Sequence, residues 1–169
     1  LLLIGTCGPA GTDEKPLMMI DPAYTNYISF AERVGRKTVT IKRKMEDNGK
    51  FTLPEVSEIE EMIQKHNPGA LLVIPYDNPT GQLYDYENMK DLAKLCVKYN
   101  MWMVSDEAYR ELYYQEDKPL VSIWGLTDAE VPGIEGRRIS IETASKVWNA
   151  CGLRIGAVIT DSAEFNNRS

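Results

Sequence analysis

The sequence contains one histidine, His66, and only three cysteines, Cys7, Cys96 and Cys151, which lie far apart. A single histidine nearly excludes hydrolases that use a serine–histidine or cysteine–histidine pair, and it nearly excludes a histidine-rich metal site. The odd number and wide spacing of the cysteines argue against both a disulfide framework and a metal cluster. We therefore predict no metal site and a reducing compartment, the cytoplasm.

Long apolar runs and extended basic stretches are also missing. No stretch reaches the ~18 uninterrupted apolar residues of a membrane span, and the run at residues 1–4 is too short, and lacks the basic start, for a signal peptide. The net charge of −6 argues against nucleic acid as a partner. The two short basic clusters, Arg36-Lys37 and Lys42-Arg43-Lys44, are interpreted as solvated strand ends.

Short apolar runs alternate with helical patterns along the 169 residues. Several runs are apolar throughout, as strands covered on both faces are. The alternation predicts one α/β domain with a mostly parallel sheet flanked by helices. The predicted strands are Leu1–Gly5, Leu17–Ile20, Thr38–Ile41, Ala70–Pro75, Met101–Ser105, Arg138–Ile141 and Ile155–Thr160. The predicted helices are Tyr24–Val34, Pro54–His66 with Pro54 as its first residue, and Tyr84–Tyr99, and Asp117–Glu135 is predicted as a loop with one short helix.

The connection between the first two predicted strands is too short. A parallel crossover needs a dozen or more residues and normally carries a helix, but only eleven residues, two glycines and two prolines among them, separate Gly5 from Leu17. Either a helix has been lost, or the sequence joins two segments that are not consecutive in the natural protein. We favour the second explanation and place the break near Thr12 and Asp13.

Residues whose side chains could act in catalysis or binding follow several predicted strands. Asn78, Asp106, Lys146 and the region of Thr6 each lie just past a strand end, where sites form on parallel sheets. Arg154 follows Lys146 by eight residues. An amine, a carboxylate and a guanidinium are what pyridoxal phosphate (PLP) requires for its aldehyde, its ring nitrogen and its phosphate. The sequence therefore predicts a PLP site at this edge.

These motifs resemble a known family. Asn78-Pro79-Thr80-Gly81, Asp106-x-x-Tyr109 and Thr143-x-Ser145-Lys146 followed by Arg154 are similar, in order and spacing, to the motif set of fold-type I (class I/II) PLP-dependent aminotransferases of the aspartate/aromatic type. Asp21-Pro22-Ala23-Tyr24 resembles the family's Pro-x-aromatic segment. The resemblance covers nearly the whole chain and implies the large domain of a PLP-dependent transferase.

The resemblance assigns catalytic roles to Lys146 and Asp106. Lys146 would form the Schiff base with PLP and then carry a proton between the substrate Cα and C4′ of the cofactor, which requires burial and neighbouring cations to ease its deprotonation. Asp106 would pair with the pyridinium nitrogen. Taken alone, Lys146 would be a surface lysine and Asp106 a cap of the following turn; the complete motif set outweighs both alternatives.

Three more residues are placed around the ring by the same resemblance. Tyr109 and Asn78 would hydrogen-bond the phenolic oxygen of PLP, although alone they are explained equally well as an interior tyrosine and a turn residue. Tyr24 would stack on the ring face. An alternative, weighted equally, places Tyr24 and Tyr27 in the core beside the following helix.

The phosphate of PLP would be bound by Arg154, with Thr143 and Ser145 as hydroxyl donors. The family usually has serine where Thr143 stands, and threonine keeps the hydroxyl. Thr6, Gly8 and Gly11-Thr12 are interpreted as remnants of a phosphate-binding loop that leads into a helix.

The reaction implied by the resemblance is transfer of an amino group from an L-amino acid to a 2-oxo acid, in amino acid metabolism. Residues 1–169 would form a large-domain fragment that lacks an N-terminal segment and a C-terminal small domain, the latter carrying the arginine that binds the substrate carboxylate. The full-length protein would be a homodimer, and the isolated fragment would turn over poorly. Alternatives are a carbon–sulfur lyase, an enzyme like aminocyclopropane-carboxylate synthase, and a non-enzymatic regulatory domain.

Overall fold

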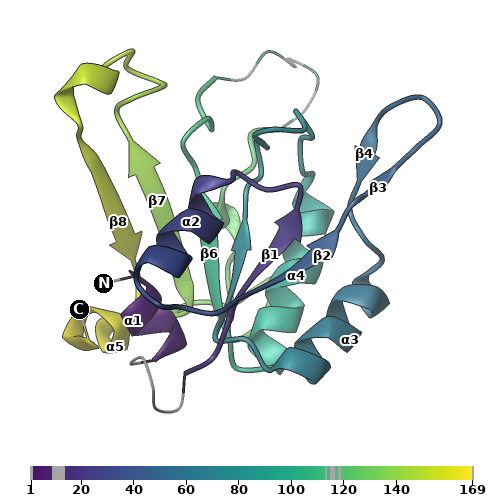
Figure 1. Ribbon diagram of the computed structural model, residues 1–169, viewed down its shortest axis with the longest axis vertical. Helices are drawn as coiled ribbons and strands as arrows, with labels where there is room; N and C mark the ends of the chain where they lie inside the picture. Colours follow the sequence, from purple (N-terminus) through teal and green to yellow (C-terminus); the bar gives the residue numbers. More distant parts are fainter. Residues whose placement is uncertain (1, 9–13, 113, 115–116, 118, 169) are drawn as a thin grey trace.

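The computed structural model describes every residue of the chain except 1, 9–13, 113, 115–116, 118 and 169. The described residues build a six-stranded sheet in the order β2-β1-β5-β6-β7-β8 (Figure 1). Every neighbouring pair is parallel except the last, which confirms the mostly parallel sheet. The strands are β1 (Leu17–Asp21), β2 (Thr38–Lys42), β5 (Ala70–Val73), β6 (Trp102–Asp106), β7 (Arg138–Thr143) and the antiparallel edge strand β8 (Gly156–Thr160).

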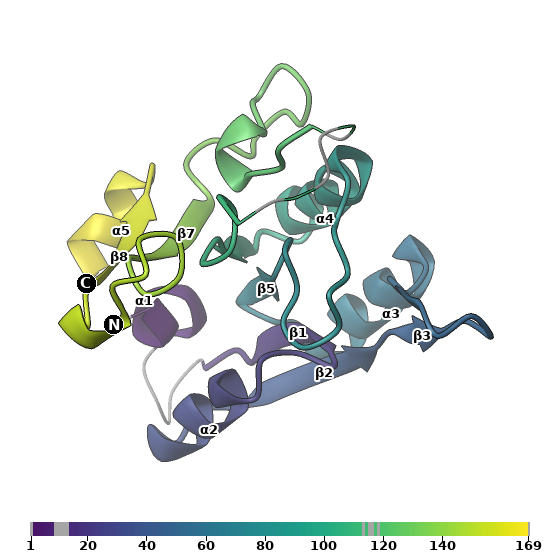
Figure 2. The same ribbon diagram turned by 90° about the horizontal axis from the view of Figure 1, so that it is seen from above.

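Helices cover both faces of this sheet (Figure 2). Helices α3 (Val56–His66) and α4 (Tyr86–Lys98) lie on one face, and α1 (Leu2–Cys7), α2 (Asn26–Arg33) and α5 (Ala163–Arg168) lie on the other. Strand β1 shows why its sequence is apolar throughout. Met18 and Ile20 join the core under α3 and α4, whereas Leu17 and Met19 join the core on the opposite face.

The long helices begin at capping boxes. In α4, Oδ1 of Asp85 accepts a hydrogen bond from the backbone N–H of Asn88 at 2.7 Å. In α3, Glu55 is the N-cap and Glu58 closes the box. Helix α3 therefore starts at Val56, and the prediction of Pro54 as its first residue is wrong because Glu55 satisfies the free N–H groups instead.

The first predicted strand is wrong. Residues 2–7 form helix α1, in which Gly5 packs against the ring of Phe165 from α5. A short apolar run fits a buried helix as well as a strand, so its pattern could not decide. The chain thus passes from a helix to β1 and needs no crossover helix, and the backbone N–H of Lys15 donates to the carbonyl of Cys7 at 2.9 Å. The predicted break near Thr12 lies outside the described residues.

The remaining elements are short. Strands β3 (Lys44–Met45) and β4 (Phe51–Thr52) form a hairpin that the sequence did not predict. Two single-turn 3₁₀ helices, η1 (Ile123–Gly125) and η2 (Cys151–Leu153), lie in loops, and η1 is the short helix expected between Asp117 and Glu135. Of the helices in the described part of the chain, none has the length and apolar content needed to span a bilayer.

The basic clusters fit the prediction of solvated strand ends at their lysines, which are exposed, but not at Arg36 and Arg43. Arg36 is 8% exposed and Arg43 is 7% exposed, because each is held by partners inside the fold. Arg36 donates to the carbonyl of Gly8 at 2.5 Å, and Arg43 pairs with the buried carboxylate of Asp77.

Candidate active site

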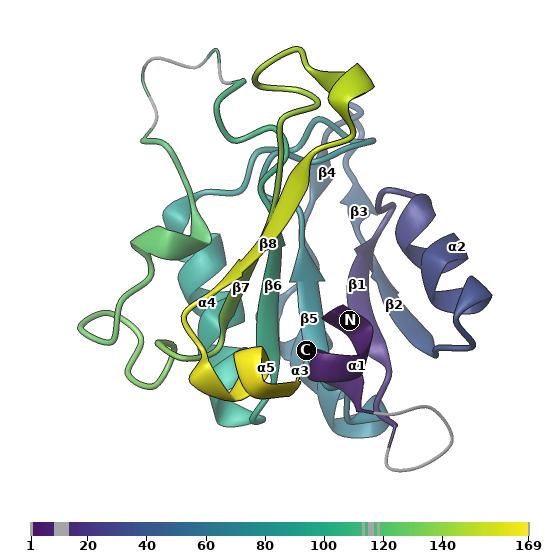
Figure 3. The ribbon, with the colours of Figure 1, turned by 90° about the vertical axis from the view of Figure 1, so that its left-hand side faces the viewer.

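A cavity of about 630 Å³ opens at the carboxyl ends of the parallel strands. The loops that follow β5, β6 and β7 gather at this end, while α1 and α5 lie at the other (Figure 3). The cavity is lined by all eight residues that the sequence singled out for PLP: Tyr24, Asn78, Asp106, Tyr109, Thr143, Ser145, Lys146 and Arg154. The fold therefore brings together groups that lie up to 130 residues apart in the chain.

The Thr6 region is the exception. Thr6 lies in α1, whose carbonyl end meets Gly69 before β5 begins, so it is at the opposite end of the sheet from the cavity. Its hydroxyl donates to the carbonyl of Leu2 at 2.9 Å within the helix. The interpretation of Thr6 and Gly8 as remnants of a phosphate-binding loop is wrong, because it followed from the incorrect first strand. Gly11 and Thr12, which belonged to the same interpretation, lie outside the described residues.

Asp106 is the last residue of β6 and is half-buried at the cavity. Its Oδ2 accepts a hydrogen bond of 2.5 Å from the phenol of Tyr27, and its Oδ1 accepts one of 3.0 Å from the backbone N–H of Ala108. Burial raises the pKa of the Asp106 carboxyl, and the two hydrogen bonds counteract part of that rise. The bond to Ala108 is the turn cap expected from the sequence, and it leaves Asp106 on the cavity wall.

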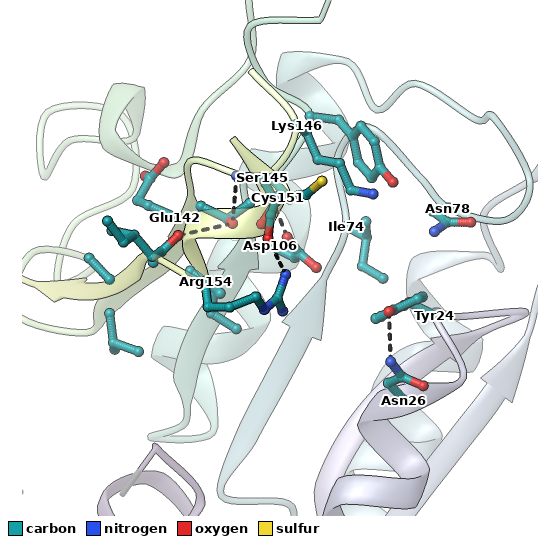
Figure 4. Close-up of a pocket in the computed structure, with 18 of the residues that line it drawn as sticks. Tyr24, Asn26, Ile74, Asn78, Asp106, Glu142, Ser145, Lys146, Cys151 and Arg154 are labelled. Carbon is teal, nitrogen blue, oxygen red and sulfur yellow. Dashed lines mark hydrogen bonds between the residues drawn. The ribbon is translucent and has the colours of Figure 1, made fainter. Parts of the chain in front are cut away.

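Tyr27, the partner of Asp106, was not predicted as a site residue. It lies in the first turn of α2, and its ring meets that of Tyr24 edge to face, with centroids 5.9 Å apart. Tyr27 packs on the core, whereas Tyr24 is 39% exposed and lines the cavity, so the core alternative holds only for Tyr27. The Tyr24 hydroxyl accepts from Nδ2 of Asn26 at 2.6 Å (Figure 4). The signal was a second tyrosine three residues after Tyr24, although Tyr24 itself lies just before α2 and not on the helix.

Lys146 lies three residues beyond β7, in the loop to β8. Its Nζ is 5.5 Å from the ring centroid of Tyr109, and the side chain extends into the cavity (Figure 4). The side chain is exposed, and the burial expected from the sequence is not found among the described residues. Lys146 is exposed because its loop extends past the edge of the sheet. The residues that line the cavity leave its mouth open at this point.

Arg154 lies at the end of η2 with left-handed backbone geometry, φ 54°. Its Nη1 donates to the carbonyl of Cys151 at 2.7 Å, which fixes the exposed guanidinium at the cavity (Figure 4). In the same loop, Oγ1 of Thr143 accepts from the backbone N–H of Ser145 at 3.1 Å. These contacts order the loop; the phosphate-binding roles of Arg154, Thr143 and Ser145 stay predictions.

Asn78 lies in the tight turn that follows β5. The carboxylate of Asp77 accepts hydrogen bonds from both the backbone N–H and the hydroxyl of Thr80, and the N–H of Gly81 donates to the carbonyl of Asp77 at 3.0 Å. Gly81 has φ 70°, which glycine adopts readily. The turn is thus closed on Asp77 and presents Asn78 to the cavity. Within the described residues, no cluster of histidine, cysteine and carboxylate groups could hold a metal ion.

The fold is that of an α/β protein with a cavity at the carboxyl edge of a mostly parallel sheet, and a lysine, an acid and an arginine line this cavity. A family model described as aminotransferase class I and II matches residues 4–167. The chain therefore belongs to this family, which confirms the resemblance seen in its motifs.

Curated relatives agree with this assignment. Aspartate aminotransferase of Pyrococcus horikoshii is 30% identical over 145 residues, which cover 84% of this chain and 33% of that protein. LL-diaminopimelate aminotransferase of Aquifex aeolicus is 32% identical over 140 residues, which cover 82% of this chain and 33% of that protein. The chain thus spans about a third of the length of these relatives.

Solved structures share the fold. The aromatic aminotransferase from Pyrococcus horikoshii OT3 has a TM-score of 0.78 at 24% identity, over 98% of this chain and 42% of that one. The PLP-bound C–S lyase from Staphylococcus hominis has a TM-score of 0.80 at 17% identity, over 98% of this chain and 40% of that one. The chain therefore has the fold of the PLP-dependent transferase large domain.

Proposed function

We propose that this chain forms the PLP-binding part of an aminotransferase that passes an amino group from an L-amino acid to a 2-oxo acid. The observation that carries the proposal is that Lys146, Asp106 and Arg154 line one cavity. When bound, PLP supplies an aldehyde that takes up amines and a ring that withdraws electrons from the adjacent carbon.

Asp106 fits the ring nitrogen of PLP. Each of its oxygens already accepts one hydrogen bond. A carboxylate offers about four acceptor positions, so Asp106 can accept another N–H. An ionised Asp106 would hold a proton at the ring nitrogen through a charge-assisted bond, which is stronger than a neutral one.

Among the described residues that line the cavity, Lys146 is the one lysine. Its Nζ is the amine that would hold the aldehyde carbon of PLP. The same Nζ would serve as the group that carries a proton beside the cofactor. The ring of Tyr109, whose centroid lies 5.5 Å from this Nζ, would orient the amine.

The other lining residues fit the remaining parts of the cofactor. Asn78 and Tyr109 would donate hydrogen bonds to the phenolic oxygen, and Tyr24 would cover one ring face. The planar guanidinium of Arg154 suits a phosphate dianion, with Thr143 and Ser145 as further donors. A cavity of about 630 Å³ lies within the usual range for cofactor sites.

The test is an absorbance titration of the protein with PLP, followed by borohydride reduction and peptide mass analysis. We expect a visible absorption band and one added pyridoxyl phosphate on the peptide that contains Lys146. Lys146→Ala should lose both. Lys90→Ala, in which the removed amine pairs with Glu87 on α4 and does not line the cavity, should retain both. A band and label that survive Lys146→Ala would remove this residue from its role.

A second reaction shares the same cofactor chemistry. The fold similarity to the C–S lyase of Staphylococcus hominis favours a lyase as the alternative. Amino-group transfer between an amino acid and a 2-oxo acid would support the first proposal, and release of a thiol from a thioether amino acid would support the second. PLP binding without either reaction would favour a regulatory domain.

We also propose that the full-length protein is a homodimer in a reducing compartment such as the cytoplasm. Trp148 is 77% exposed and Leu153 is 67% exposed in the loop that carries Lys146, and such apolar groups commonly mark interfaces. Cys7, Cys96 and Cys151 are free. Light scattering of the intact protein tests the dimer, and a monomer at micromolar concentration would contradict it.

A further inference from the structure

A buried arginine lies directly behind the cavity wall. Arg43 follows β2, and its side chain is 1% exposed, while that of its partner Asp77 is fully buried. The contact is bidentate: Nη1 donates to Oδ2 of Asp77 at 2.8 Å, and Nη2 donates to Oδ1 at 3.1 Å. Nη2 also donates to the hydroxyl of Tyr84 at 2.7 Å, and Nη1 donates to the carbonyl of Pro22 at 2.7 Å.

This guanidinium joins two loops that are far apart in the sequence. Pro22 lies two residues before Tyr24, and Asp77 lies immediately before Asn78. The backbone N–H of Arg43 also donates to the carbonyl of Asp21 at 2.6 Å. Tyr24 and Asn78 both line the cavity, on the side away from Arg154 (Figure 4). One buried guanidinium thus contacts both the loop that carries Tyr24 and the loop that carries Asn78.

Stability alone is a weak explanation for this pair. Two buried charges lose their hydration, and apolar residues of similar size often replace such pairs without loss of stability. Arg43 also has a buried Nε that finds no hydrogen-bond partner among the described residues. A bidentate pair does, however, fix geometry in a way that apolar contacts do not. The arrangement is thus better suited to positioning than to stabilisation.

We propose that Arg43 is a positioning residue for the cofactor. Through Asp77 it holds Asn78 at the phenolic oxygen of PLP, and through Pro22 it holds Tyr24 against the ring. Asp77 transmits the constraint because the same carboxylate closes the turn around Asn78 by accepting from Thr80. This inference rests on the proposed PLP function.

The experiment uses the intact protein loaded with PLP and the variant Arg43→Lys, which keeps the charge but loses the bidentate contact. A hydrogen bond donated to the negatively charged phenolic oxygen favours the deprotonated form of the bound cofactor. Loss of this bond should therefore raise the pH midpoint of the visible absorption band by about half a unit or more. We expect a matching loss of PLP affinity of about tenfold. In an Asn78→Ala background, Arg43→Lys should move the midpoint little further, because the two changes act on one contact.

Arg138→Lys is the matched control. Arg138 forms an arginine–carboxylate pair with Asp161 at 2.6 Å, and neither residue lines the cavity. Arg138→Lys should leave the pH midpoint of the visible absorption band unchanged. Should Arg43→Lys fail to fold, Tyr84→Phe removes only one acceptor of Arg43 and should shift the midpoint in the same direction by less.

The possible outcomes are distinguishable. A parent protein with no visible band on PLP addition would overturn the proposed function and this inference with it. A parent that binds PLP, together with an Arg43→Lys variant whose unfolding midpoint falls but whose spectral midpoint is unchanged, would overturn only the positioning role. An equal spectral shift in Arg138→Lys would overturn it as well.

Discussion

The phenol of Tyr27 donates a hydrogen bond of 2.5 Å to Oδ2 of Asp106, and so joins helix α2 to the end of strand β6. Burial raises the pKa of the Asp106 carboxyl, and the bond from Tyr27 is the larger of the two hydrogen bonds that lower it. A carboxylate that must be ionised to hold a proton on a cofactor ring needs such a donor. Tyr27 therefore favours the ionised form of Asp106, which is the form that can pair with the cofactor ring.

Tyr27→Phe should weaken PLP binding. Without the phenol, the pKa of Asp106 rises further, and a larger fraction of the carboxyl is protonated and unable to pair with the ring nitrogen. A charge-assisted bond of this kind contributes about 1.5–3 kcal/mol, so we expect PLP affinity at neutral pH to fall by about tenfold or more in a fluorescence or absorbance titration. Tyr99→Phe is the control, since the hydroxyl of Tyr99 bonds Glu60 away from the cavity. Equal affinities for parent and Tyr27→Phe would refute the role.

Asp106→Asn should stabilise the cofactor-free protein at neutral pH while abolishing productive PLP binding. The pKa of Asp106 is raised by folding, so the folded protein binds this proton more tightly than the unfolded chain. The free energy of unfolding therefore falls as pH rises from the unfolded pKa, near 3.9, to the folded value. Removing the charge should raise the free energy of unfolding at pH 7 and leave it unchanged near pH 3. Urea unfolding of both proteins at these two pH values measures the difference, and a variant that is less stable at pH 7 would contradict the sign.

The local sequence pattern predicted the sheet and the residues at the strand ends that line the cavity. The features that it missed depend on contacts between residues far apart in the sequence. The strand Leu17–Ile20 was predictable because burial on both faces leaves an uninterrupted apolar run. Helix α1 was not, because its packing depends on Phe165, far away in the sequence. Arg43 looked like a solvated strand end, since its partner Asp77 is 34 residues away and no local signal connects them. Asn78, Asp106 and Lys146 were predictable together because parallel strands end at one edge, and the other site residues were predicted from the resemblance to the family.

Arg154→Gln should discriminate between PLP and pyridoxal, which lacks the phosphate. If the guanidinium binds the phosphate, its loss removes a charge-assisted contact worth about 1.5–3 kcal/mol for PLP, a loss of about tenfold or more in affinity. Pyridoxal affinity should change little, because Arg154 makes no other predicted contact with the ring. Parallel titrations with the two ligands give the comparison. An equal loss for both would mean that Arg154 acts by ordering its loop, through its bond to Cys151.

Two glycines test the placement of α1 against the sheet. A Cβ on Gly69 would lie 2.4 Å from the carbonyl oxygen of Thr6 and 3.0 Å from Cα of Cys7, which are backbone atoms of α1 that cannot rotate away. Gly69→Ala must therefore push α1 from the end of β5, and we expect a loss of about 1–3 kcal/mol in the free energy of unfolding.

Gly152, in η2, is the matched control because a Cβ there meets nothing within 4 Å and the backbone is not in the left-handed region. Gly152→Ala should change stability little, or raise it by about 0.4–1 kcal/mol through the reduced freedom of the unfolded chain. Urea unfolding of both variants without PLP makes the comparison. If Gly69→Ala is as stable as Gly152→Ala, α1 does not lie against β5. A strand formed by residues 2–7 would then be possible again.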